Sequence, residues 1–393
     1  MNEAFIVSAT RLPIGRFGGA LKEVSDWDLG TIVISEALKR AELRGGDIDE
    51  VIMAHGFRTG DLPANSSRAV ALRAGIPIEI PEFTINKACG GSLRAVSLAA
   101  QMIKSEERDI IVAGGMESMS RAAYILPKVR WGSRLGHAQL IDQLVLIDPI
   151  SGYSLGETGE NVAELYKISR EDQDQFAFLS QQKAERAIKS KIFQEEIVTV
   201  PIPQGRGGSS VFDTDEHPRF GTTLEALSQM KPAFKKNGTI TAGNASGLND
   251  GASAVVVMSR RKVKELGIHP LVSIRSYASV GVKPEIMGIG PIPATKKALE
   301  RGGLALKDID LIELNEAFAA QSVAVIRELG MDMERVNVNG GAIALGHPIS
   351  ATGCILLTKI IYEMKRRKSK FGLVTMCIAG GQGIAMIVEN EPS

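Results

Sequence analysis

Short apolar runs alternate with longer segments of helical periodicity along most of the chain. The runs AFIVSA (residues 4–9) and IIVAGG (110–115), and the strand-like part of DIDEVIMAHG (47–56), have the length and apolar content of buried strands. Residues 27–43 and 92–104 instead place apolar side chains three and four positions apart, which is typical of helices. This alternation predicts an α/β layered architecture around a mostly buried sheet.

The middle of the chain, residues 120–246, departs from this pattern. It has few β-branched runs and contains polar, glycine-rich stretches such as GYSLGETGENV and PQGRGGSSVFDTDEHP. Within it, Arg170–Lys189 has the spacing of one long amphipathic helix. We interpret this region as an inserted, loop-rich domain, a kind of segment that often carries functional residues.

The last third of the chain repeats the order of the first. GGDIDEVIMAHG near residue 50 is matched by LKDIDLIELNEA near residue 310, and IIVAGG at 110–115 is matched by MCIAGG at 376–381. The offsets of 261 and 266 residues are nearly equal, which favours a duplicated α/β unit over chance similarity between apolar strands. The predicted parts are an N-terminal half of residues 1–119 plus 247–269, the inserted domain 120–246, and a C-terminal half of residues 270–393.

Length and composition are typical of a globular protein of two or three coupled units. The chain has 393 residues, of which 44% are hydrophobic and 23% charged. Its 46 basic and 45 acidic residues give a formal net charge of +1, so the charge balance does not favour nucleic acid as a partner. The sequence has neither the pattern of a secretory signal nor an uncharged apolar run of membrane-spanning length. We expect a cytoplasmic protein that binds neither nucleic acid nor membrane.

Three cysteines, Cys89, Cys354 and Cys377, lie far apart in the sequence. Their odd number and wide spacing argue against a disulfide framework and favour a reducing compartment. Cys354 lies inside a helical run and is followed by ILL, so we assign it to packing. Because no cluster of Cys and His has the spacing of metal ligands, we predict no metal site.

Cys89 lies in NKACGGSLRA, where glycines and a serine lead into a helical run. This predicts a thiol at or just before a helix N-terminus, where unpaired N–H groups and the helix dipole favour an anion. Such a setting lowers the pKa of a thiol and favours a nucleophilic thiolate. The alternative is a compact buried side chain with no chemical function.

Packing of the two halves about a pseudo-twofold axis would bring corresponding loops together at their interface. The turn at Cys89 then faces GGAIALGHPISATG at 340–353, and the end of IIVAGG corresponds to Cys377, so Cys89, His347 and Cys377 come close. Two thiols and an imidazole suit acyl transfer through a thioester. Cys89 would be the nucleophile, His347 the base or oxyanion donor, and Cys377 a second acid or base.

Asn315, in NEAFAA, follows a strand-like run and is a candidate to orient a water or to donate to an oxyanion. Each of these candidates has a structural alternative. Asn315 could cap the next helix, His347 could be a loop histidine bonded to backbone, and Cys377 could be a core residue at a strand end.

Seven motifs, all in family order, resemble the thiolase family over essentially the whole chain. They are NKACGGSLRA, GGMESMSRA, TAGNASGLNDGASA, GIGPIPA, NEAFAAQ, GGAIALGHPISATG and CIAGGQG. The similarity is to the acetyl-CoA acetyltransferase and 3-ketoacyl-CoA thiolase branch. It implies the thiolase-like fold, which is a duplicated α/β/α/β/α layered arrangement with an inserted loop domain that binds CoA.

The resemblance also implies roles for the residues named above. Cys89 is acylated by an acyl-CoA, His347 activates it and helps bind the thioester oxygen, and Cys377 moves a proton to or from the α-carbon or the CoA sulfur. Asn315 holds a water in one oxyanion hole, and the backbone N–H groups of Cys89 and Ala379 form a second. Coenzyme A is then a substrate, and no cofactor is bound permanently.

Substrate-binding residues follow from the same motifs. In the family, CoA contacts come largely from the inserted domain and from the NASG turn. By motif position these are Arg219, Ala242, Ser246 and Leu248, with Phe234 against the pantetheine, and Leu155, Met287 and Phe318 as further substrate-binding candidates.

Four departures from the family pattern fall close to the predicted site. The order of glycine and serine at 91–92 is the reverse of the usual one, and Ser350 and Ala379 stand where glycine is usual or common. Ser-Leu at 154–155 stands where short-chain members commonly have His-Met. The four reactive groups are intact, so the reaction class is kept and the identity of the acyl group is left open.

We therefore predict a thiolase that cleaves a β-ketoacyl-CoA with CoA, or catalyses the reverse Claisen condensation, through an acyl-Cys89 intermediate. Acetoacetyl-CoA is the default substrate, and a bulkier, branched or aromatic β-ketoacyl-CoA is the main alternative. A catalytically silent subunit that binds CoA esters and a decarboxylating enzyme of the ketosynthase type are the alternatives from other classes. The resemblance implies a homodimer or homotetramer, with VRWGSRLGHAQLID as the loop that ties dimers together, and leaves open a further subunit.

Overall fold

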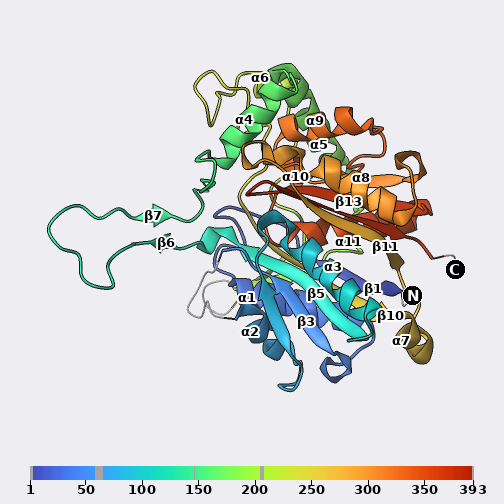
Figure 1. Ribbon diagram of the computed structural model, residues 1–393. Helices are drawn as coiled ribbons and strands as arrows, with labels where there is room; N and C mark the ends of the chain where they lie inside the picture. Colours follow the sequence, from blue (N-terminus) through green and yellow to red (C-terminus); the bar gives the residue numbers. More distant parts are fainter. Residues whose placement is uncertain (1–2, 58–64, 146, 204–207, 392–393) are drawn as a thin grey trace.

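A mixed sheet built from two related halves forms the body of the protein (Figure 1). The computed structural model describes residues 3–57, 65–145, 147–203 and 208–391. The strands of the sheet are β1 (Ala4–Arg11), β2 (Gly15–Arg16), β3 (Glu50–Ala54), β4 (Glu82–Ile85), β5 (Ile110–Ser118), β10 (Asn249–Ser259), β11 (Val272–Gly281), β12 (Leu311–Leu314), β13 (Phe371–Ile378) and β14 (Gln382–Glu389). Their order is β12-β13-β14-β11-β1-β10-β5-β3-β4, with β2 paired to β10.

The pairing pattern repeats on the two sides of the junction between β1 and β11. In the N-terminal half, β3 is parallel to β5, β5 is antiparallel to β10, and β10 is antiparallel to β1. In the C-terminal half, β12 is parallel to β13, β13 is antiparallel to β14, and β14 is antiparallel to β11. Strand β3 therefore corresponds to β12 and β5 to β13, as the two sequence echoes predict. The predicted duplicated α/β fold is confirmed.

Helices form layers on and between the two halves of the sheet (Figure 1). The helices concerned are α1 (Asp26–Arg40), α2 (Ser66–Arg73), α3 (Gly91–Lys104), α7 (Arg260–Leu266), α8 (Pro291–Gly302), α9 (Ala319–Leu329), α10 (Ala342–Leu345) and α11 (Thr352–Arg367). Helices α3 and α11 pack against each other in the middle layer, whereas α1 covers the N-terminal half and α8 the C-terminal half. None of the helices in the described ranges is long and apolar enough to cross a membrane.

Alternating side chains along the strands explain why helices cover both faces. Ile111 and Val255 belong to the apolar cluster that contains α3 and α11, whereas their neighbours Val112 and Val256 belong to the cluster that contains α1. Successive side chains of a strand point to opposite faces, so each strand supplies both layers. This is why these strands are apolar throughout rather than alternating with polar residues.

The middle of the chain forms helices and short two-stranded ribbons beside the sheet. Its elements are β6 (Tyr124–Ile125), β7 (Ile141–Asp142), α4 (Leu155–Leu165), α5 (Arg170–Lys189), β8 (Val200–Pro203), β9 (Ser209–Phe212) and α6 (Leu224–Ser228). The predicted helix Arg170–Lys189 is confirmed over its full length, and Ser169 caps its first turn. The exact domain limits stay a prediction.

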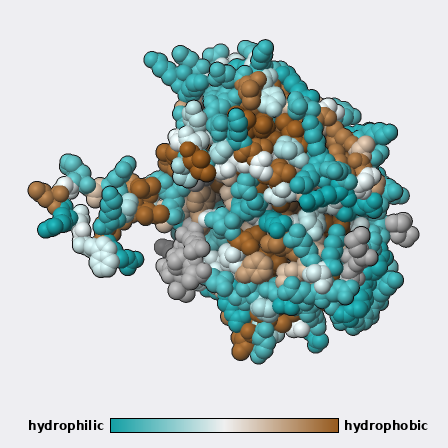
Figure 2. Space-filling view, in the orientation of Figure 1, coloured by the Kyte–Doolittle hydropathy of each residue, from teal (hydrophilic) through white to brown (hydrophobic). Residues whose placement is uncertain are grey.

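The segment that contains β6 and β7 projects from the body as a long ribbon (Figure 1). It carries exposed apolar side chains among polar ones (Figure 2). Trp131 is 90% exposed and Leu140 is 59% exposed, which is costly for side chains of this size in water. Contact with another surface would therefore remove apolar area of the ribbon from water.

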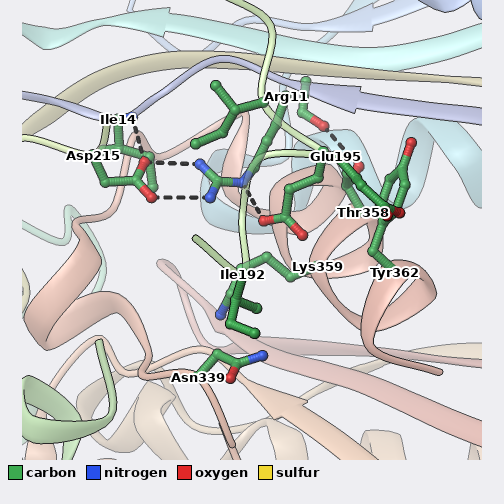
Figure 3. Close-up of polar contacts among 12 residues, drawn as sticks. Arg11, Ile14, Ile192, Glu195, Asp215, Asn339, Thr358, Lys359 and Tyr362 are labelled. Carbon is green, nitrogen blue, oxygen red and sulfur yellow. Dashed lines mark hydrogen bonds and ion pairs between the residues drawn. The ribbon is translucent and has the colours of Figure 1, made fainter. Parts of the chain in front are cut away.

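A buried ion-pair network joins the end of β1 to the segments after α5 (Figure 3). The guanidinium of Arg11 donates to both carboxylate oxygens of Asp215, at 2.8 and 2.9 Å, and to Glu196 at 2.7 Å. The backbone N–H of Ile14 donates to the same Asp215 carboxylate at 2.8 Å. All three charged side chains are fully buried. Removing the cation would leave two carboxylates without compensation in the interior, so Arg11 fixes the middle of the chain to the sheet.

Candidate active site

Cys89 lies in a helical turn, Ala88–Gly90, directly before α3. Ala88 has φ +42°, a strained value for a residue with a side chain, and its N–H donates to Asn86 Oδ1 at 3.0 Å. A Cβ on Gly90 would overlap Ile378 of the other half, and one on Gly91 would lie 2.8 Å from the Cβ of Ala54. The turn is therefore pressed against the interface between the two halves, with a backbone conformation that the surroundings enforce.

The Cys89 thiol is more deeply buried than its position at a helix start suggests. Burial raises its pKa to about 11, although backbone N–H groups of Ala379 and Cys89 favour the thiolate, and the charge of Glu117 raises the pKa further. The prediction of a lowered thiol pKa is wrong for this reason. A base that takes the proton is thus needed before Cys89 can act as a nucleophile.

His347 is buried in a setting that fixes its tautomer. Its Nδ1 lies 2.7 Å from the hydroxyl of Thr352, and that hydroxyl donates to the carbonyl of Pro348 at 3.0 Å. Because the hydroxyl proton is used in this way, Thr352 accepts from Nδ1–H, and Nε2 is the unprotonated nitrogen. Nε2 has no hydrogen-bond partner within the described parts of the chain. Burial lowers the pKa of His347 to about 4, so the imidazole is neutral near pH 7 and can accept a proton.

Cys89, His347 and Cys377 line one cavity of about 430 Å³. Cys377 lies one residue before the end of the apolar strand β13 and is fully buried. Burial, and then the neighbouring Cys89, raise the pKa of the Cys377 thiol far above its usual range. The structure therefore brings together the three groups that the duplication argument placed at the interface, and presents them to the same space.

Asn315 is fully buried directly after β12, and its backbone N–H donates to Thr375 at 3.0 Å. Neither its amide nitrogen nor its amide oxygen has a partner among the described residues. The residue that caps α9 is Phe318, so Asn315 is not a helix cap. A buried amide with unmet donors and acceptors usually binds a water, and Asn315 could hold one. Asn315 itself does not line the cavity, although Ala317 and Phe318 do.

The predicted substrate-binding residues fall into two groups. Six of them line the cavity with Cys89: Leu155, Phe234, Ser246, Leu248, Met287 and Phe318. Within this group the rings of Phe234 and Phe318 meet edge to face, with centroids 6.1 Å apart. Arg219 and Ala242 instead line a separate pocket of about 170 Å³ together with His217 and Met230.

A second cavity, of about 290 Å³, also opens onto Cys89. Its apolar wall consists of Phe57, Ile147, Pro149, Leu155 and Ile349, and Ala379 and Gly380 form part of its floor. Cys89, Leu155 and Ile349 border both cavities, so the nucleophile lies where two spaces meet. The backbone N–H groups of Cys89 and Ala379 point toward the sulfur, and their role as an oxyanion hole stays a prediction.

Two residues with clear positions at the site were missed by sequence reasoning. Thr352 fixes the tautomer of His347, and Asn249 accepts from the His347 N–H at 2.9 Å while its amide donates to Gly15. Both lie inside motifs that the sequence displays, but a threonine or asparagine beside glycines is equally typical of a turn. Only the fold reveals which partner each side chain meets.

The departures at 91–92 and at Ser350 are in direct contact. The Ser92 N–H donates to the carbonyl of Ser350 at 3.1 Å, and the Ser92 hydroxyl accepts from the Cys354 N–H at 2.9 Å. Ser92 thus links the starts of α3 and α11, one from each half. Within the described ranges, no group of three or more His, Cys, Asp or Glu is placed to hold a metal ion.

Comparison with known proteins identifies the family. A model described as thiolase, N-terminal domain, matches residues 4–261, and one described as thiolase, C-terminal domain, matches residues 268–390. The chain belongs to the thiolase family. This thiolase is 55% identical over 395 residues to the acetyl-CoA acetyltransferase of Syntrophomonas wolfei, with 99% of each chain covered. The predicted thiolase function is confirmed, and the protein is an acyltransferase.

Solved structures of thiolases have the same fold. The acetyl-CoA acetyltransferase of Bacillus anthracis is 45% identical, with a TM-score of 0.97 over 100% of this chain and 99% of its own. The human mitochondrial 3-ketoacyl-CoA thiolase in complex with CoA is 41% identical, with a TM-score of 0.96 over 100% of this chain and 98% of its own. The thiolase-like fold predicted from the sequence is confirmed.

Proposed function

We propose that this thiolase transfers an acyl group between an acyl-CoA and CoA through a thioester on Cys89, with acetoacetyl-CoA as a substrate. The observation that carries the proposal is the shared cavity of Cys89, His347 and Cys377, at which His347 offers an unprotonated Nε2. The names of the acetyl-CoA acetyltransferases similar to this chain, and the CoA complex of the human thiolase, support CoA and a short acyl-CoA as substrates.

The first half-reaction acylates the enzyme. His347 Nε2 accepts the proton of Cys89, and the thiolate attacks the C3 carbonyl of acetoacetyl-CoA. The N–H groups of Cys89 and Ala379 stabilise the oxyanion that forms. The C2–C3 bond then breaks, and Cys377 donates its proton to C2. Carbons C1 and C2 leave as acetyl-CoA, whereas C3 and C4 stay on Cys89 as an acetyl group.

The second half-reaction returns the acetyl group to CoA. The Cys377 thiolate takes the proton of the CoA thiol, whose sulfur attacks the acetyl carbonyl on Cys89. As the second acetyl-CoA forms, the Cys89 sulfur leaves and recovers its proton from His347. Asn315 is proposed to hold a water that hydrogen-bonds an oxyanion in one of these steps, because its buried amide has unmet donors and acceptors.

CoA is proposed to enter along the apolar wall that Phe234, Leu248 and Phe318 give to the larger cavity. This wall suits the pantetheine arm, which carries amides on a mainly hydrocarbon chain. Arg219, at the neighbouring pocket, is then proposed to meet the charged end of CoA.

A second candidate substrate class, the bulkier β-ketoacyl-CoAs, is favoured by the cavity of about 290 Å³ at Cys89. Attack at C3 leaves the whole acyl group on the nucleophile, so a group larger than acetyl needs space beside Cys89. The side chains of Phe57, Ile147 and Pro149 offer an apolar space of this kind. We also propose a homodimer or homotetramer in which the β6–β7 ribbon contacts a further copy, because burial of Trp131 and Leu140 would remove apolar area from water.

Steady-state assays test both substrate classes. The protein is assayed with CoA and acetoacetyl-CoA, and then with straight, branched and aromatic β-ketoacyl-CoAs. Cys89→Ala should abolish every activity, whereas Cys354→Ala, which removes an equally buried thiol used in packing, should retain it. Absence of turnover with all substrates, together with no acyl adduct on Cys89, would favour a silent subunit that binds CoA esters.

A further inference from the structure

The catalytic steps above do not use Glu117, a fully buried carboxylate next to the cavity. It lies near the end of β5, and its charge contributes to raising the pKa of Cys89. Burying a carboxylate costs several kcal/mol unless its oxygens are bonded. The Glu117 carboxylate nevertheless lies beside a nucleophile that must itself become an anion, so its presence there needs a physical reason.

The oxygens of Glu117 bind the backbone of two loops that wall the nucleophile. Oε1 accepts from the Phe57 N–H at 2.9 Å, and Oε2 accepts from the N–H groups of Gly56 at 3.2 Å and Ser350 at 3.1 Å. Gly56, Phe57 and Ile349, the neighbour of Ser350, line the cavity at Cys89. One carboxylate thus joins the loop after β3 in the N-terminal half to the His347 loop in the C-terminal half.

The fit around this carboxylate is tight. A Cβ on Gly56 would lie 2.7 Å from Glu117 Oε2 and 2.7 Å from the Ser350 hydroxyl oxygen, so only glycine brings its N–H to the carboxylate. Ser350 also holds the start of α3, since its carbonyl accepts from the Ser92 N–H at 3.1 Å. The chain of contacts from Glu117 through Ser350 to Ser92 therefore ends three residues after the nucleophile.

A histidine lies beside this carboxylate. His55 Nε2 lies 2.7 Å from Asp26 and 3.9 Å from Glu117 Oε1, and its Nδ1 lies 2.8 Å from the Ser66 hydroxyl. Burial raises the pKa of Glu117, while the charge of His55 and the hydrogen bonds from Phe57 and Ser350 lower it. N–H donors occupy both oxygens, which favours the ionised form against the effect of burial, and within the described parts of the chain the titratable groups that face Glu117 are His55 and Cys89.

We propose that Glu117 is a positioning residue of the thiolase reaction, which holds the loop at Gly56–Phe57 and the loop at Ile349–Ser350 in place around acylated Cys89. The proposal rests on the proposed function, because it concerns the geometry of the same nucleophile. Glu117 touches no reacting atom and acts through the backbone of these two loops. Its negative charge is a separate effect, which opposes formation of the Cys89 thiolate.

These two effects predict opposite changes in Glu117→Gln. The amide NH₂ would face a backbone N–H in either orientation, so at least one loop is released. A displacement of about 1 Å costs on the order of 10²-fold in rate, so kcat should fall by tenfold or more with KM for acetoacetyl-CoA changed by less than about threefold. Removal of the charge should lower the pKa of Cys89, so iodoacetamide should alkylate Cys89 faster than in the wild type at about pH 8.

Two further variants separate geometry from charge and from stability. Gly56→Ala pushes the loop off the carboxylate without a change of charge, so kcat should fall while Cys89 alkylation is not accelerated. Glu196→Gln removes a carboxylate that is equally buried but paired with Arg11 away from the cavity, and should keep wild-type kcat per folded enzyme. Circular dichroism and urea unfolding define the folded fraction of each protein.

The outcomes discriminate the proposal from the function on which it rests. The positioning role would be overturned if Glu117→Gln and Gly56→Ala both kept the wild-type kcat. It would also be overturned if kcat fell no more in Glu117→Gln than in Glu196→Gln. Faster alkylation of Cys89 in Glu117→Gln at wild-type kcat would also overturn it, because only the charge effect would then be present. If the wild-type enzyme neither turns over any β-ketoacyl-CoA nor forms an adduct on Cys89, the proposed function itself fails.

Discussion

Thr352→Val tests how His347 is prepared to act as a base. Valine has nearly the shape of threonine but cannot accept the proton on Nδ1, which lies 2.7 Å from the Thr352 hydroxyl. His347 and Thr352 are both buried, so water does not readily replace the lost partner. The tautomer with the proton on Nε2, which cannot accept the Cys89 proton, is then no longer disfavoured.

The size of the effect follows from the cost of a buried donor without a partner. That cost is about 1–3 kcal/mol, and each 1.36 kcal/mol corresponds to tenfold in rate, so acylation should slow by about 5- to 160-fold. Binding of the substrate does not involve the Thr352 hydroxyl, because that group hydrogen-bonds only to His347 and Pro348 in the described structure. The loss should therefore appear in kcat, with KM for acetoacetyl-CoA nearly unchanged.

A single-turnover measurement of Cys89 acylation by acetoacetyl-CoA is the direct assay. Thr358→Val is the matched control, because Thr358 is equally buried on the same helix and meets Ser253 rather than the histidine. A Thr352→Val enzyme that acylates at the wild-type rate, while His347→Ala is inactive, would refute the argument that Thr352 sets the tautomer.

Three further predictions concern stability, titration and binding. Arg11→Met should lower the free energy of unfolding by about 3–5 kcal/mol, because Glu196 and Asp215 lose their buried cation. A loss below about 1 kcal/mol in urea unfolding, which is the value for an exposed ion pair, would contradict this. Burial raises the pKa of Cys89 to about 11, so the rate at which Cys89 is alkylated should keep rising with its thiolate fraction from about pH 7 to about pH 10. A plateau of this rate near the ordinary thiol pKa of about 8.5 would contradict a buried thiol. Phe234→Ala should raise KM for CoA by about fourfold or more, because the cavity wall then buries less of the pantetheine arm, at about 0.8 kcal/mol for each CH₂ left in water. An unchanged KM in a CoA titration would mean that CoA binds elsewhere.

Features that depend on local periodicity or on repetition were predictable from the sequence. Helix α5 has the predicted bounds Arg170–Lys189, because a continuous amphipathic pattern with a serine cap specifies both ends. The match between β3 and β12, and between β5 and β13, follows from the repeated apolar runs, and it predicted that Cys89 and Cys377 would meet. Repetition carries long-range information that a single strand pattern lacks.

Properties that depend on depth and on distant partners could not be predicted. The helix N-terminus at Cys89 suggested an acidic thiol, but burial dominates and the pKa is raised. The tautomer of His347 depends on a hydroxyl proton that Pro348 accepts, and no sequence pattern specifies that chain of bonds. Glu117 reads as one more residue of a buried strand, and its three backbone partners come from two loops that only the fold brings together.

The central claim, that an acyl group is carried by Cys89 at the interface of the two halves, is tested most directly by peptide mass spectrometry. The wild-type protein is incubated with acetoacetyl-CoA or acetyl-CoA without free CoA, quenched in acid and digested. We predict one acetyl group on the peptide that contains Cys89, none on the peptides of Cys354 and Cys377, and removal of the acetyl group when CoA is added. An acetyl group on another residue, or an adduct on Cys89 that CoA does not remove, would contradict the claim.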